Sequence, residues 1–145
     1  MTHRHPTSVV VATVGRMIIP FIQLFALYVI VHGESGPGGG FQGGVILASS
    51  IILLLVIFGL PEAKRIISER LGILLASVGL FLYAGIGLAS IFFGGKYLEY
   101  DVLPLINPVK ASEFGIIFVE IGIGITVMAV MVLILYFMAT GGQEE

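Results

Sequence analysis

Four long apolar runs, separated by short polar segments, dominate the sequence. They span approximately residues 11–31, 43–60, 71–93 and 115–139. A bilayer core of about 30 Å requires about 20 apolar residues in a helix, and only helices or closed barrels satisfy the backbone in lipid. Because the runs are continuous and not barrel-like, we predict an all-α fold. It is a single domain over 1–145, an integral membrane bundle of four transmembrane helices.

The composition supports a membrane protein and excludes several other classes. Only 11% of the residues are charged, whereas soluble domains carry about 25%. A net charge of −2 offers no basic patch for nucleic acid, and the absence of cysteine excludes disulfides and thiolate metal sites within the chain. No nucleophile–base arrangement stands out, and the dinucleotide-like match at 38–43 lacks the required βαβ unit. We therefore expect no catalytic centre, no metal site and no cofactor.

The distribution of positive charge predicts the orientation. Of the seven Lys and Arg residues, five lie near the start of the first run or in the 61–70 loop, and two lie in the 94–114 loop. Cytoplasmic loops carry an excess of Lys and Arg. Both chain termini are therefore predicted to be cytoplasmic, with the segment between the first two runs on the outer side.

That outer segment is the most unusual part of the chain, with seven glycines between residues 33 and 44. Glycine lets neighbouring backbones come close. His32, which could titrate near neutral pH, together with Glu34 and Gln42, supplies polar groups to the segment. Two interpretations stay open: a tight joint with another subunit, or a cation site built from converging oxygens.

Glu120 lies within the fourth apolar run, where a carboxylate is costly and is a functional candidate by default. Glu113, seven positions earlier, lies on the same helical face. Glu120 is either a protonatable or cation-binding relay group, or a glutamate that fixes helix packing. It lies about five residues from the outer end of its run. We therefore expect one polar cluster of Glu120, His32 and the glycine-rich segment.

The first run carries Arg16 and Gln23, with Pro20 between them to bend the helix. Arg16 lies near the opposite, inner end of the bundle, so depth argues against its pairing with Glu120. A long arginine side chain near a helix end extends to the interface, and we expect this of Arg16. Gln23 is expected to form a hydrogen bond between helices.

Two segments resemble the B subunit of Mrp (Mnh) multisubunit cation/proton antiporters. Residues 32–44 resemble that family's signature of His-Gly, a few variable positions, Pro-Gly-Gly-Gly-Phe and a second glycine pair. Gly36 departs from it, since many members carry Ser or Thr close before the proline. Residues 118–126, in which Glu120 precedes a Gly-x-Gly-x-Thr run, resemble the fourth-helix segment. The resemblance covers essentially the whole chain. The matching loop residues are Pro37, Gly38, Gly39, Gly40, Phe41, Gly43 and Gly44.

The resemblance implies a small subunit of a hetero-oligomeric complex in a prokaryotic cell membrane that exchanges Na⁺ for H⁺. Such a subunit carries no redox centre and packs against other Mrp-type antiporter subunits, including larger channel subunits. It either helps to line a polar ion path or forms a joint between subunits. Two alternatives stay open: the related ion-translocating module of a membrane-bound hydrogenase or similar respiratory complex, and a purely structural membrane scaffold.

Overall fold

The computed structural model describes residues 8–33, 35–104 and 107–141. All of the regular structure in these ranges is helical. Four helices are long and apolar enough to cross a membrane, which confirms the predicted all-α fold with four membrane-length helices. They are α1 (Val9–Val31), α2 (Gly40–Phe58), α4 (Glu69–Phe92) and α5 (Pro108–Gly141). Two shorter elements are α3 (Leu60–Ile66) and the 3-10 helix η1 (Tyr100–Val102).

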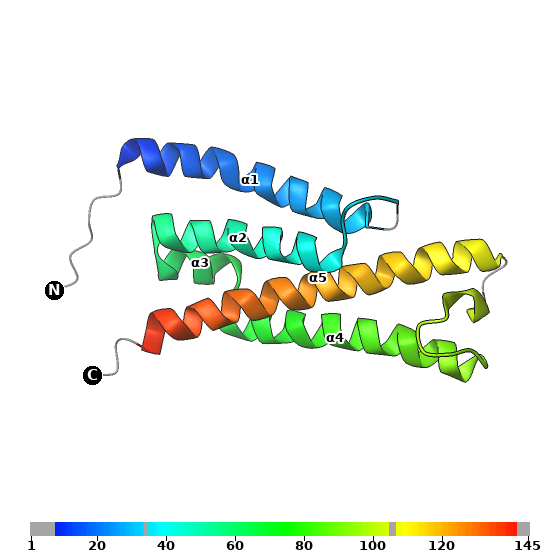
Figure 1. Ribbon diagram of the computed structural model, residues 1–145. Coiled ribbons are helices and arrows are strands. Elements are labelled where there is room, and N and C mark those ends of the chain that lie inside the picture. Colours follow the sequence, from blue (N-terminus) through cyan, green and yellow to red (C-terminus); the bar gives the residue numbers. More distant parts are fainter. Residues whose placement is uncertain (1–7, 34, 105–106, 142–145) are drawn as a thin grey trace.

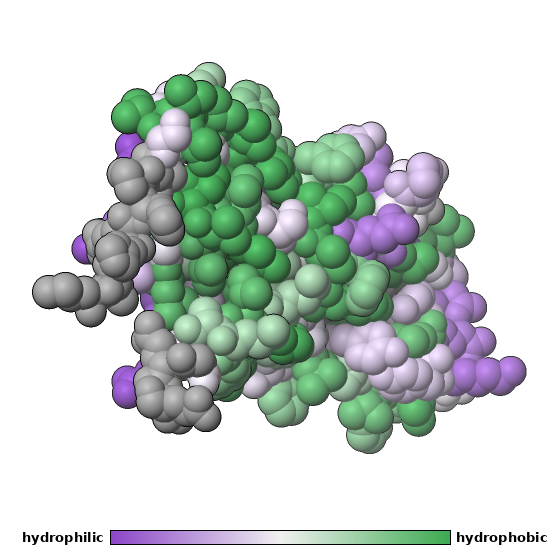
Figure 2. Space-filling model, turned by 60° about the vertical axis from the view of Figure 1, so that its left-hand side comes forward, coloured by the Kyte–Doolittle hydropathy of each residue, from purple (hydrophilic) through white to green (hydrophobic). Residues whose placement is uncertain are grey.

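The long helices lie side by side in the order α1, α2, α5, α4 (Figure 1). The central helices α2 and α5 each pack on two long neighbours, and α1 and α4 form the edges. The edge helices consequently leave large apolar side chains exposed, among them Phe21 of α1 and Phe81 of α4. Figure 2 shows hydrophobic side chains over most of the visible face, with hydrophilic residues mainly towards its margins. This surface is suited to lipid or to another apolar protein face.

Two helix boundaries follow from local chemistry. The fourth long helix, α5, begins at Pro108, earlier than the expected start at 115. Proline is favourable at a first helical position, and the Asn107 side chain accepts a hydrogen bond from the Val109 N–H at 3.0 Å. The chain turns between α2 and α3 at Gly59, whose φ of +91° favours glycine. Part of the expected 61–70 loop is therefore helical.

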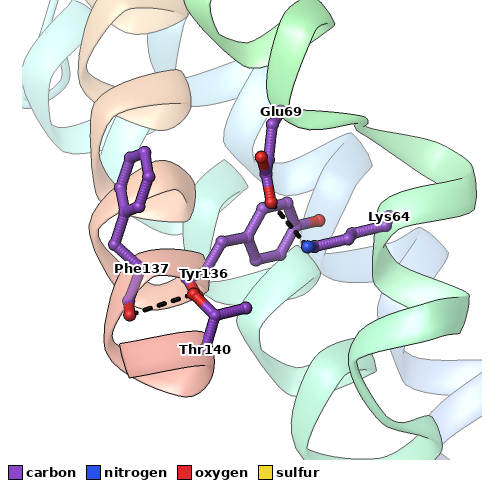
Figure 3. A network of polar contacts seen from close by, with 5 residues as sticks. All are labelled: Lys64, Glu69, Tyr136, Phe137 and Thr140. Carbon is purple, nitrogen blue, oxygen red and sulfur yellow. Dashed lines mark hydrogen bonds and ion pairs between the residues drawn. The ribbon is translucent and has the colours of Figure 1, made fainter. Parts of the chain in front are cut away.

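The apolar core lies at the end of the row that carries α3, called here the α3 end. Its buried side chains come from α2, α3, the turn after α3 and α5: Ala48, Ile51, Ala63, Ile67, Met128, Val132 and Tyr136. Over this core, the Lys64 Nζ lies 2.5 Å from Glu69 Oε1 and 5.9 Å from the centre of the Tyr136 ring (Figure 3). The opposite end, where α1 ends and α2 begins, is called the glycine-loop end.

Candidate functional site

The glycine-rich segment forms a tight cap between α1 and α2. The N–H of Gly36 donates to the His32 carbonyl at 3.1 Å, and the N–H of Gly39 donates to the Val29 carbonyl at 3.1 Å. Gly39 has a φ of +137°, which other residues rarely adopt. The Gly39 carbonyl then accepts the N–H of Gly43 at 2.9 Å and starts α2. The segment is thus folded back onto the last turn of α1.

The Glu120 side chain rests against this cap. A methyl group on Gly33 would collide with the Glu120 carboxyl, and one on Gly40 would collide with the Glu120 backbone carbonyl. A Cβ on Gly39 would lie 3.6 Å from Glu120 Oε1. The carboxyl therefore lies against backbone from both sides of the α1–α2 turn. It lies at the N-terminus of α2, where the helix dipole favours negative charge.

Three tyrosines lie on the α4 side of the same region. The Tyr100 ring packs on Gly115 of α5, and the Tyr97 ring packs on Gly87 of α4. Tyr83 meets Tyr97 edge to face, with ring centres 6.3 Å apart. Burial, and then the neighbouring charges of Tyr83, Tyr97 and Glu120, raise the pKa of Tyr100. Tyr100 is thus within electrostatic range of Glu120 and stays a neutral phenol near pH 7.

Sequence reasoning did not find this tyrosine cluster. Tyr97 and Tyr100 occur in a loop where aromatic residues also suit a membrane interface. The available signal was Gly87 and Gly115, which are small residues near the ends of two neighbouring helices. Each leaves a recess that a ring from the connecting loop fills.

The other polar residues expected near Glu120 differ in position. The His32 ring is exposed and stacks on Tyr28, with ring centres 4.0 Å apart and Nδ1 3.2 Å from the Tyr28 carbonyl. Gln42 and Glu113 are exposed, whereas Glu120 is half-buried. Glu34 lies outside the described residues. The structure therefore brings Glu120 and the glycine-rich cap together, and it leaves the His32 ring exposed at the end of α1.

Arg16 lies far from this site. Its guanidinium stands 5.2 Å from the centre of the Phe58 ring, at the last residue of α2, whereas Glu120 contacts the first residues of α2. Gln23 is half-buried midway along α1. The depth argument against an Arg16–Glu120 pair therefore agrees with the structure.

Close helix contacts fix the position of Glu120 on α5. A methyl group on Gly122 would collide with the Gly79 carbonyl of α4, and a methyl group on Gly44 of α2 would collide with the Gly124 carbonyl. Residues two apart on a helix point to nearly opposite sides. Gly122 therefore allows α4 to approach α5 closely, and Gly124 allows α2 to do so. The Thr126 hydroxyl donates to the Gly122 carbonyl at 2.9 Å and approaches an α4 carbonyl at 3.4 Å.

The chemistry available here is that of one carboxyl group beside backbone amides and phenols. A carboxyl of this kind can take up and release a proton, and its oxygens can contact a monovalent cation together with backbone carbonyls. Among the described residues, no group of three or more His, Cys, Asp or Glu side chains could hold a metal ion.

Comparison with known proteins supplies the family. Residues 10–133 match the model of a domain related to the MnhB subunit of Na⁺/H⁺ antiporters, a stretch that includes the glycine-rich cap and Glu120. The chain is 29% identical over 137 residues to the B subunit of the Na⁺/H⁺ antiporter of Bacillus subtilis, covering 88% of this chain and 95% of the relative. It is 31% identical over 130 residues to the "putative antiporter subunit mnhB2" of Staphylococcus aureus, covering 83% and 92%.

The four membrane-length helices and this similarity agree with each other. Together they describe a multi-pass membrane protein whose matched region extends from the second residue of α1 into the last third of α5. The chain belongs to the MnhB family.

Proposed function

We propose that this chain is a small membrane subunit of a multisubunit Na⁺/H⁺ antiporter, in which Glu120 exchanges a proton or contacts the transported cation beside the glycine-rich cap. The observation that carries the proposal is the position of the Glu120 carboxyl against Gly33 and Gly39, with the Glu120 backbone carbonyl held against Gly40. Gly33 follows α1 and Gly39 precedes α2, so backbone from both ends of the α1–α2 turn approaches this titratable group. The relatives' names supply the ions.

The same structure favours action within a complex. The row of helices is open at both edges, and α1 and α4 expose large apolar side chains such as Phe21 and Phe81. The polar groups around Glu120 end at the apolar core of the α3 end. A continuous ion path would therefore need further polar groups from neighbouring subunits, the larger channel subunits of the antiporter.

The central test replaces Glu120 with Gln, which keeps the shape and removes the titratable group. The matched control is Glu113→Gln, on the same helix but exposed. In everted membrane vesicles we expect Glu120→Gln to lower Na⁺-dependent proton exchange by at least tenfold and Glu113→Gln to leave it near the wild-type rate. Complex yield after affinity purification should match in all three proteins.

Two results would overturn the proposal. If Glu120→Gln retains full exchange, the carboxyl does not take part in transport. If Glu120→Gln lowers the yield of the complex but not the exchange rate per assembled complex, Glu120 is a packing residue and the subunit is a scaffold. Glu120→Asp separates these cases, because it keeps the charge but shortens the reach. We expect partial exchange with a shifted pH profile.

We also propose that both termini lie on the cytoplasmic side of a prokaryotic cell membrane. The chain has no cysteine, so single cysteines can report sidedness. Ser35 and Ser68 are exposed at opposite ends of the row. A membrane-impermeant maleimide added to intact cells should label Ser35→Cys, and Ser68→Cys only after permeabilisation. The reverse pattern would invert the orientation.

A further inference from the structure

A cavity of about 270 Å³ opens at the α3 end, away from Glu120. It lies where the first half of α1 meets the end of α2 and the short helix α3. Its lining combines two charged side chains with three apolar ones: Arg16, Leu54, Phe58, Glu62 and Ile66. The volume is several times the roughly 30 Å³ that one water occupies in the liquid, so a phosphate group fits.

The two charged side chains that line the cavity, Arg16 and Glu62, form no ion pair with each other. Glu62 accepts hydrogen bonds from Arg65 Nη1 at 3.1 and 3.3 Å, so its carboxylate is already compensated. The ion pairs of the described residues are Lys64–Glu69 and Arg65–Glu62, which leaves the exposed guanidinium of Arg16 without a carboxylate among them. Arg16 is covered on one side by the Phe58 ring, at 5.2 Å.

The position of Arg16 along α1 favours pairing of its charge with an anion. It lies seven residues after the first residue of α1, or about 10 Å along the helix. A charged side chain within a membrane helix is costly unless it reaches a partner or the interface. An arginine fork matches a phosphate group with two parallel hydrogen bonds.

We propose that this cavity binds the phosphate group of an anionic phospholipid, held by Arg16, with the start of an acyl chain on Leu54, Phe58 and Ile66. The apolar walls favour a lipid over a carboxylate from a neighbouring subunit, because a carboxylate would meet the charge and leave the walls uncovered. The site is independent of Glu120, and so of the proposed transport role.

The test uses the complex as it purifies from membranes, after detergent exchange to remove loosely held lipid. Phosphatidylglycerol or phosphatidylcholine is added, and bound lipid is counted by native mass spectrometry. We expect wild-type protein to retain phosphatidylglycerol at least fivefold better than phosphatidylcholine. Arg16→Gln should abolish this preference, and Arg16→Lys should keep part of it.

The matched control is Arg70→Gln, which removes the same charge at the same end from an exposed residue that does not line the cavity. It should keep the preference. Equal losses in Arg16→Gln and Arg70→Gln would show a diffuse charge effect and overturn the proposal. Equal retention of both lipids by wild-type protein would do the same, as would a cross-link placing a neighbour's carboxylate on Arg16. The wild-type lipid comparison remains decisive if Arg16→Gln fails to assemble.

Discussion

The two ends of the helix row are held together in different ways. At the glycine-loop end, helices meet backbone to backbone, at Gly40 against Glu120 and at Gly44 against Gly124. At the α3 end they meet through side chains, with Val132 and Tyr136 each 1% exposed. Enlarging a residue should therefore destabilise the protein at the glycine-loop end, and truncating a side chain should destabilise it at the α3 end. The carboxyl of Glu120 belongs to the glycine-loop end, where it lies against the backbone of Gly33 and Gly39.

The largest effect is expected from Gly40→Ala. The new methyl would meet the carbonyl oxygen of Glu120, which cannot move without shifting α5. Overpacking costs about 1–3 kcal/mol where side chains can adjust and more where, as here, the backbone must move. We expect a clear fall in the thermal stability and yield of the purified complex. Gly36→Ala, in open space by the same measure, is the control. Equal behaviour of the two variants would remove the distinction between the ends.

A somewhat smaller loss is expected from Tyr136→Ala at the α3 end. Deleting a large buried ring costs about 3–5 kcal/mol in soluble cores. Here lipid can replace part of the lost contact, whereas Gly40→Ala displaces the backbone of a whole helix, so we expect Tyr136→Ala to lose less stability than Gly40→Ala. Tyr136→Phe should be close to neutral, because the buried hydroxyl has no hydrogen-bond partner among the described residues. Thermal unfolding of the purified complex measures both. A Phe variant as unstable as the Ala variant would show that the hydroxyl binds a group outside this chain.

The smallest effect is expected from Thr126→Val between the two ends. This change removes the hydroxyl that reaches from α5 to an α4 carbonyl. Hydrogen bonds between membrane helices contribute on average about 0.6 kcal/mol. Thr140→Val is the control, because the Thr140 hydroxyl donates to carbonyls of its own helix (Figure 3). Thermal shifts that do not differ between the two valine variants would remove the interhelical role of Thr126.

Sequence reasoning predicted the helices and the meeting of Glu120 with the glycine-rich segment. The helices follow from the length of the apolar runs, and the meeting follows from counting residues to the same membrane depth. The lateral order of the helices could not be predicted, because apolar faces are equally compatible with several neighbours. The early start of α5 was missed because a proline in a loop and a proline at a first helical position look alike in a sequence. The hydrogen bond from the Val109 N–H to the Asn107 side chain, which distinguishes them, is seen only in the structure.

The segment 61–70 shows the same limit of prediction from the sequence. Its charges were used only to predict the orientation, yet Lys64 lies between Glu69 and the buried Tyr136 ring, which is 72 positions further along the chain than Lys64. Long-range neighbours of this kind are set by packing of the whole row. No local pattern of charges contains that information.

The length of α5 has a mechanical consequence. Its 34 residues extend about 51 Å at 1.5 Å per residue, and even a tilt of about 40° leaves roughly 39 Å across a hydrocarbon layer of about 30 Å. At least one end of this unbroken rod must therefore emerge from the lipid. A displacement of the turns outside the lipid would pass along this continuous helix to Glu120, because α5 would move as a rigid body.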